Sequence, residues 1–133
     1  MYTLYRMSPR LFLLSNNSQV KLAKVVWEGD AVKVISRFPD DVRRDLGFQI
    51  YKLQLGERPD DFKSMTSIGP GVYELRESDD RTWYRVIYFS KVADTIYILH
   101  CFEKKTSKTS KPDIETAKLR LKRVRTRLAE EKK

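Results

Sequence analysis

The stretch Tyr97-Ile-Leu-His-Cys-Phe-Glu-Lys-Lys-Thr-Ser-Lys-Thr-Ser110 decides how this chain is organised. Its first half is apolar at successive positions, which is typical of a central strand that is buried on both faces. Its second half is a loop of lysine and hydroxyl side chains, and a basic helix pattern follows it. The core of the domain therefore leads directly into side chains that suit phosphate groups.

Positive charge is concentrated at this end of the chain. Residues 104–133 contain twelve lysines and arginines against four acidic residues, a net +8, whereas the whole chain of 133 residues carries a formal +9. A sequence pI of about 9.7 indicates a polyanionic partner, and RNA, DNA, an acidic protein and an anionic membrane all fit that description.

Composition narrows the class of protein. A hydrophobic share of 41% supports one packed domain, which we expect over residues 21–133, with residues 1–20 as an extension of unclear role. The single cysteine, Cys101, rules out an internal disulfide, and it suits a reducing compartment. No stretch reaches the roughly 20 apolar residues of a membrane span, and the apolar run 11–14 is short for a signal peptide. We expect a cytoplasmic protein.

The first half of the domain reads as a strand followed by a helical hairpin. Residues 22–27 have the pattern of a short strand, and Asp30 is placed to cap a helix over 31–38. Apolar residues then recur at helical spacing over 41–55. Gly56 is placed to end this second helix.

The second half reads as three strands and a helix. Strands are predicted over 72–77, 82–90 and 95–102, and their short connections favour an antiparallel meander. Ser110 begins the last helix with a capping pattern. The predicted fold class is α+β, with an antiparallel sheet and the helices packed on one face. The other face would then be free to bind a partner.

Short motifs follow one another in a fixed order between about residues 24 and 125. They are Trp27-Glu-Gly-Asp30, Phe38-Pro39, Gly47, Leu55-Gly56, Pro59-Asp60, Phe62-Lys63, Gly69-Pro-Gly-Val-Tyr-Glu-Leu-Arg76, Tyr84-Arg-Val-Ile-Tyr88, and Leu99-His-Cys-Phe-Glu-Lys-Lys-Thr106 with Thr109. This ordered set resembles the HigB-type toxins, the phage-derived branch of the RelE/ParE superfamily.

The resemblance implies a small RelE-like domain and a toxin of a type II toxin–antitoxin system. Such a toxin is a ribosome-dependent endoribonuclease that cleaves mRNA during translation. Its partners would be the ribosome, mRNA and a helix-turn-helix (HigA-like) antitoxin, with no membrane. The free toxin would be a monomer, and the complex with antitoxin a heterotetramer or larger.

The chemistry suggested by the residues needs no metal or cofactor. The chain has one His and one Cys, and its sequence shows no paired metal ligands, no phosphate-cradling Gly loop and no Ser nucleophile motif. These features weigh against metallohydrolases, P-loop enzymes and acyl-transfer hydrolases. RNA supplies its own nucleophile, the 2′-OH. Clustered Arg and Lys side chains can hold the phosphate and assist proton transfer. The products would be a 2′,3′-cyclic phosphate or 3′-phosphate and a 5′-hydroxyl.

Two arginines are candidates to clamp the scissile phosphate. Arg76 and Arg85 lie on adjacent predicted strands, and they form one electropositive pair if the register aligns them. The alternative is structural pairing of these arginines with Glu74, Glu77 or Asp79.

Lysines complete the predicted catalytic set. Lys104 and Lys105 follow the last strand, where one could transfer a proton and the other bind phosphate, unless both are simply solvated. Lys63, in the loop before the first meander strand, is a further candidate.

His100 and Tyr88 are weaker catalytic candidates. His100 has a side chain suited to proton transfer near neutral pH, but it shares parity with Ile96, Ile98 and Phe102, so it reads more readily as a core residue. Tyr88 could stack on a base, whereas Tyr84 and Cys101 read as packing residues.

Basic residues of the loop and the last helix are predicted to bind ribosomal RNA phosphates. They are Lys108, Lys111, Lys118, Lys122, Arg123 and Arg125, and the helix carries Arg127 beside them. Three other interpretations stay open. The protein could be a non-catalytic nucleic-acid-binding module or a ParE-like toxin that targets gyrase, and the basic helix could instead dock an acidic antitoxin.

Overall fold

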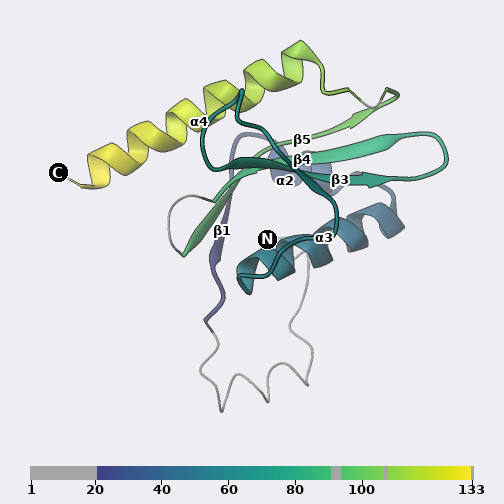
Figure 1. Cartoon of the computed structure of the whole chain (residues 1–133), viewed down its shortest axis with the longest axis horizontal. Coiled ribbons are helices and arrows are strands. Elements are labelled where there is room, and N and C mark those ends of the chain that lie inside the picture. Colours follow the sequence, from purple (N-terminus) through teal and green to yellow (C-terminus); the bar gives the residue numbers. More distant parts are fainter. Residues whose placement is uncertain (1–20, 91–93, 107, 133) are drawn as a thin grey trace.

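A computed structural model gives the fold of residues 21–90, 94–106 and 108–132. The predicted extension, residues 1–20, lies outside the described residues. The elements follow one another as β1 (Lys24–Trp27), α2 (Ala31–Ile35), α3 (Asp40–Gln54), β2 (Phe62–Ser64), β3 (Val72–Ser78), β4 (Trp83–Phe89), β5 (Thr95–Lys104) and α4 (Lys111–Glu131) (Figure 1).

The strands form one five-stranded sheet in the order β1-β5-β4-β3-β2. The predicted antiparallel meander of β3, β4 and β5 is confirmed. Two features differ from the prediction. β1 pairs with β5 in parallel, which the long intervening chain permits. Part of the predicted 58–71 loop forms the edge strand β2, which pairs with β3.

One face of the sheet is covered by the predicted helical hairpin. Ala31 and Ile35 of α2, together with Leu46 and Ile50 of α3, pack on side chains that include Val86 of β4. α3 begins after Pro39 and ends before Gly56, whose φ of +80° is the left-handed conformation that favours glycine after a helix. These contacts confirm an α+β domain with a helical hairpin on one face.

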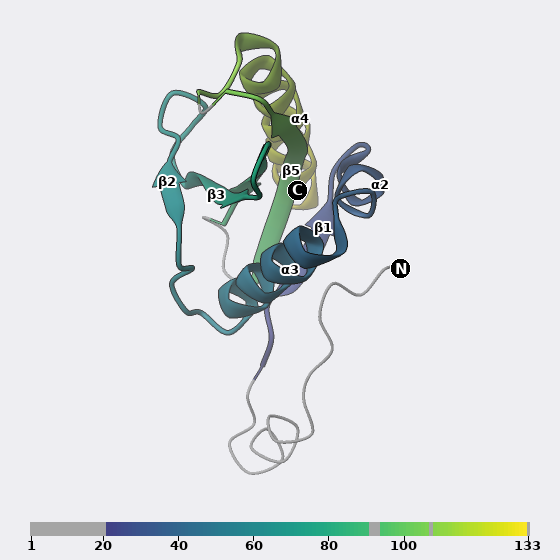
Figure 2. The same cartoon turned by 90° about the vertical axis from the view of Figure 1, so that its right-hand side faces the viewer.

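The opposite face is not free, so the prediction of an open sheet surface is wrong over most of its area. Ala117, Leu121 and Val124 of α4 pack on Ile87 and Leu99 of the central strands. Figures 1 and 2 show α4 and α3 on opposite sides of the sheet. The physical reason is that the central strands are apolar on both faces, and an uncovered apolar face would be costly in water.

A bulge in β5 changes which residues share a face. Ile87 pairs with His100 and its neighbour Tyr88 pairs with Ile98, so Leu99 is an extra residue in β5. Beyond the bulge, Phe102 packs with the α4 cluster, whereas Ile98 packs with the α3 cluster. The prediction that His100, Ile98 and Phe102 share one face is therefore wrong, because a bulge interrupts the alternation on which it rests.

The two predicted helix starts differ in outcome. Ser110 caps α4 as predicted, because its Oγ accepts a hydrogen bond from the backbone N–H of Asp113. Asp30 precedes α2 but makes no capping hydrogen bond with its side chain. Its carboxylate instead accepts a hydrogen bond of 2.9 Å from Arg120 of α4. Arg120 also donates to the Leu99 carbonyl at 3.0 Å and thereby fastens α4 to the sheet.

Candidate functional site

The two candidate arginines lie directly opposite each other. The register pairs Arg76 of β3 with Arg85 of β4, so both side chains project from the face of the sheet on which α4 packs. Glu74, two residues earlier in β3, brings its Oε1 to 3.4 Å from Arg85 Nε and 3.9 Å from Arg76 Nε. The electropositive pair and the structural pairing with Glu74, posed as alternatives, therefore occur together.

Arg76 and Arg85 differ sharply in exposure. Arg85 is 1% exposed, and its Nη1 donates to the backbone carbonyls of Tyr84 and Glu77 at 3.2 and 3.4 Å. Burial lowers the pKa of Arg85, and the charge of Glu74 opposes that shift. The side chain of Arg76 is 33% exposed. Arg76 can therefore touch a ligand in solvent, while Arg85 contributes its charge from beneath.

The two candidate lysines also occupy different environments. β5 continues to Lys104, two residues beyond the predicted end of the strand. Lys104 lies on the same face as Arg85, because Arg85 pairs with Phe102 and alternation returns to that face at residue 104. Lys104 is only 9% exposed, whereas Lys105 is exposed.

The pKa of Lys104 lies below its usual value. Burial is the largest cause, and the positive charges of Arg85 and Lys108 act in the same direction. The carboxylates of Asp113 and Glu74 oppose the shift. A lysine with a lowered pKa holds a larger neutral fraction near neutral pH and can then accept a proton.

Arg76, Arg85 and Lys104 form a basic cluster on the α4 face of the sheet, and Lys63 of the edge strand lies beside it. Lys63 pairs with Glu74 across β2 and β3. A cavity of about 320 Å³ opens beside it, with Arg76, Lys108 and Thr109 also in its wall. Three of the remaining six lining residues carry a hydroxyl group; the six are Ser64, Met65, Thr66, Ser67, Glu74 and Ile114. This hollow presents cations and hydrogen-bond donors to a ligand, as a phosphate site does.

A second cavity lies beside the loop that follows β5. Its volume is about 610 Å³, and Lys104 and Lys105 form part of its wall. Its other lining residues are Glu103, Thr106, Lys108, Thr109, Ser110, Lys111, Asp113 and Ile114. The two hollows share Lys108, Thr109 and Ile114. Four of the catalytic candidates and two of the RNA-binding candidates therefore line adjoining parts of one basic surface: Lys63, Arg76, Lys104, Lys105, Lys108 and Lys111.

Thr109 fixes that loop to the sheet. Its Oγ1 donates a hydrogen bond of 2.7 Å to Glu74 Oε2. The sequence suggested Glu74 only as a structural partner of the arginines, and it suggested no contact between Glu74 and Thr109. The two residues are 35 positions apart in the chain, so no local pattern would reveal the contact.

His100 is held between the sheet and α4. Its Nε2 lies 2.8 Å from Asp113 Oδ1, and its ring stacks on Phe102 at a centroid distance of 4.9 Å. His100 and Lys104 lie on the same face, with Phe102 between them. These contacts favour a structural role, in which His100 helps to position the start of α4.

Tyr88 lies away from the cluster. It is buried within the core beneath α3, on the face of the sheet opposite to Arg76. Burial raises its pKa strongly. Tyr84 and Cys101 belong to the same core, as predicted for packing residues, and the Tyr84 hydroxyl donates to Asp79 at 2.9 Å. The structure therefore does not bring Tyr88 together with the other catalytic candidates.

The basic residues of α4 fall into two groups. Lys122 and Arg123 are exposed. Lys118 Nζ lies 3.9 Å from Glu115 Oε1. The guanidinium carbon of Arg125 lies 5.7 Å from the centre of the Phe89 ring. Arg120 and Arg127 instead bind acidic residues near the end of β1. The basic character of α4 thus serves the fold at some positions and leaves others available.

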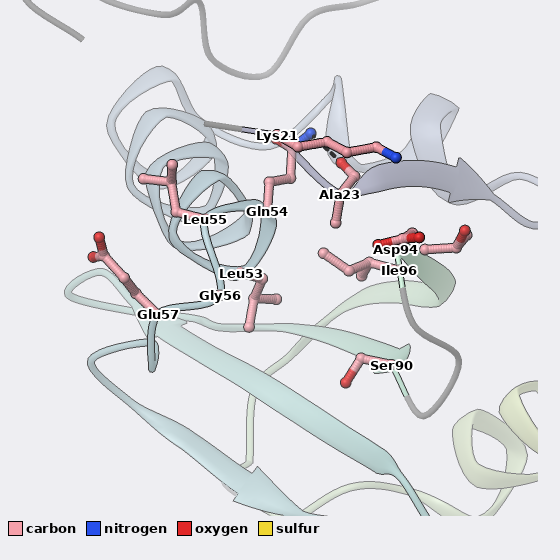
Figure 3. A pocket seen from close by; sticks show the side chains of 11 residues that line it. Lys21, Ala23, Leu53, Gln54, Leu55, Gly56, Glu57, Ser90, Asp94 and Ile96 are labelled. Carbon is pink, nitrogen blue, oxygen red and sulfur yellow. Dashed lines mark hydrogen bonds between the residues drawn. The ribbon is translucent and has the colours of Figure 1, made fainter. Parts of the chain in front are cut away.

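Another hollow, of about 430 Å³, opens at the far end of the sheet between the end of α3 and the start of β5. Figure 3 shows Lys21, Glu57 and Asp94 around it, a mixed set of charges. β5 begins beside this hollow and ends at Lys104, so the hollow is distinct from the basic cluster.

In the described parts of the chain, no group of three or more His, Cys, Asp or Glu side chains is arranged to hold a metal ion. None of the helices there has the length and apolar character needed to cross a bilayer.

Comparison with known protein families gives a match over most of the chain. The family model described as Phage derived protein Gp49-like (DUF891) matches residues 33–122, which are 90 of the 133 residues. The matched range contains all of the catalytic candidates, from Lys63 to Lys105. Comparison with curated proteins gave no match.

Proposed function

We propose that this chain is a HigB-type endoribonuclease. The premise is that the chain belongs to the Gp49-like family of phage-derived proteins, which is a RelE/HigB-like toxin family of toxin–antitoxin systems. The substrate of the enzyme is mRNA held in the translating ribosome. The observation that carries the proposal is the placement of Arg76, Arg85 and Lys104 on one face of three adjacent strands.

The arginines and exposed lysines bind the RNA backbone. Arg76 contacts the scissile phosphate from solvent, and Arg85 adds positive charge beneath it. Lys63 and Lys108, in the smaller hollow, neutralise a neighbouring phosphate. Such fixed cations stabilise the additional negative charge that develops on phosphorus in the transition state.

Lys104 is the general base of the proposed reaction. Its neutral amine accepts the proton of the 2′-OH, and the 2′ oxygen forms a bond to phosphorus. The bond from phosphorus to the 5′ oxygen then breaks, and Lys105 delivers a proton to the leaving oxygen. The products are a 2′,3′-cyclic phosphate and a 5′-hydroxyl, so atoms and protons balance without a further reactant.

The partner of the toxin is an antitoxin, as its family implies. We infer that this antitoxin is a helix-turn-helix protein and that it silences the toxin by covering the basic cluster. Exposed Lys122 and Arg123 of α4 bind ribosomal RNA in the active toxin.

The test is tightly controlled expression of the toxin in bacteria, with growth and mRNA 5′ ends as readouts. Arg76→Ala and Lys104→Met are compared with wild type, and Arg44→Ala is the matched control because Arg44 is an exposed cation of α3, on the other face. We expect growth arrest and new 5′ ends inside reading frames with wild type and Arg44→Ala only.

Other outcomes distinguish the alternatives. RNA binding with intact mRNA and normal growth would overturn the enzyme and leave a binding module. Growth arrest with intact mRNA and a DNA-damage response would instead identify a gyrase-directed toxin of the ParE type.

A further inference from the structure

One carboxylate lies at the centre of the basic cluster. Glu74 is 1% exposed, and its Oε1 faces Arg85 and Arg76 at 3.4 and 3.9 Å. Lys63 is its partner on the neighbouring strand. A buried carboxylate is costly unless charges or hydrogen bonds compensate it, and here both kinds of partner are present.

The two oxygens of this carboxylate do different work. Oε1 faces the arginines of the sheet, whereas Oε2 accepts the 2.7 Å hydrogen bond from Thr109. Thr109 belongs to the loop that carries Lys105 and Lys108, and both basic hollows include Thr109 in their walls. Glu74 therefore joins the phosphate-binding arginines to the lysine-bearing loop.

We propose that Glu74 is the positioning residue of this site, which holds Arg85 and Arg76 in one geometry and fastens Lys108 and Thr109 beside Arg76 through the Thr109 hydrogen bond. This inference rests on the proposed ribonuclease function. It adds an acidic residue to a site otherwise predicted from cations, and it gives that residue no contact with RNA.

Glu74 also contributes to the electrostatic environment of Lys104. The groups that act on Lys104 are Asp113 of α4 and Glu74 of β3, which favour its charged form, and Arg85 of β4 and Lys108 of the loop, which oppose it. Loss of the negative charge at residue 74 should therefore lower the pKa of Lys104 further. The pH dependence of cleavage reports this change, whereas a merely structural role would leave it unaltered.

Two substitutions separate the two contacts. Glu74→Gln keeps the size of the side chain and an oxygen that can accept from Thr109, but it removes the charge. Thr109→Val keeps the shape of the loop residue and the charge of Glu74, but it removes the tether. Glu57→Gln is the matched control, because Glu57 is an exposed carboxylate beyond the end of α3 and lines only the hollow that is distinct from the basic cluster.

The experiment measures kcat and KM against pH with the purified full chain and ribosomes programmed with mRNA. For Glu74→Gln we expect kcat to fall by roughly 10–100-fold, which is the usual loss when a partner that orients a functional group is removed. We also expect the limb of the pH–rate profile that reports protonation of Lys104 to move to lower pH. For Thr109→Val we expect a higher KM with the limb unmoved. Glu57→Gln should resemble wild type.

The result that overturns the inference differs from the one that overturns the function. Cleavage by wild type together with an unchanged kcat and pH profile for Glu74→Gln would remove the role of Glu74 and leave the ribonuclease intact. Absence of cleavage by folded wild type would overturn both. If Glu74→Gln does not fold, Thr109→Val decides the matter, and an unchanged KM in that variant contradicts the tether.

Discussion

The guanidinium of Arg127 binds the carboxylate of Glu28 through two hydrogen bonds, of 2.9 and 2.6 Å. They join the last turns of α4 to the residue that follows β1, 99 positions away in the chain. Glu28 is 7% exposed, and the hydrogen bond to Glu28 is the main cause of the raised pKa of Arg127. A planar, two-point pair of this kind fixes orientation as well as charge.

Arg127→Met should therefore lower the free energy of unfolding by more than Arg123→Met on the same helix does. The substitution leaves the buried Glu28 carboxylate without this partner, which costs about 1–3 kcal/mol. Urea unfolding at pH 7 measures the loss. Arg123→Met is the control on the same helix, because Arg123 is exposed, and its unfolding free energy should stay within about 0.5 kcal/mol of wild type. Equal effects of the two substitutions would contradict a structural role for Arg127.

Arg76 and Arg85 should respond differently to truncation. Arg76→Ala removes a partly exposed charge, so we expect cleavage to fall by roughly 10²–10³-fold with nearly native stability. Arg85→Ala leaves Glu74 buried without its nearest cation, which costs about 3–5 kcal/mol. Thermal unfolding and cleavage rates of both variants test the contrast. A destabilised Arg76→Ala beside a stable Arg85→Ala would show that the two roles are reversed.

Lys104→Met should abolish cleavage and stabilise the fold. The pKa of Lys104 is below 10.5 in the folded protein, mainly through burial, so the unfolded chain binds more protons between the folded pKa and 10.5. Wild-type stability therefore gains a contribution from Lys104 as pH rises through that window, and the charged form is unfavourable below it. The urea midpoint at pH 7 should be higher in Lys104→Met, and the alkaline gain should be absent. A lower midpoint would show that Lys104 stabilises the fold as a cation.

Ribosome binding should depend strongly on salt through the exposed part of α4. Each phosphate contact that is lost lowers the slope of log affinity against log salt by about 0.7–0.9. A triple substitution of Lys118, Lys122 and Arg123 to Gln should lower the slope accordingly while leaving kcat unchanged. A second triple substitution, of Arg37, Arg43 and Arg44 to Gln on the α3 side of the sheet, removes the same number of charges and controls for net charge. An equal change of slope in both sets would indicate general attraction and no defined surface.

Local patterns were sufficient for much of the fold. Period-two and period-3.6 spacing located β3, β4, β5, α3 and the start of α4 to within about two residues, and the capping role of Ser110 is confirmed. The same reasoning failed where pairing is not local. It missed the edge strand β2 and the parallel place of β1. It also failed at the bulge beside Leu99, because one extra residue reverses the parity of every later side chain.

The sequence by itself determined that a small α+β domain carries almost all of its net charge in its last thirty residues and places arginines on adjacent strands. Spacing along the chain fixes these features, because neighbouring residues in a strand or helix keep a regular geometry. Only the tertiary structure decided which cations serve the site and which serve the fold. Burial separates Arg85 from Arg76 and Lys104 from Lys105, and the distant partners Glu74 and Glu28 engage Thr109 and Arg127. Desolvation and ion pairing depend on three-dimensional neighbours, which have no signature in local sequence.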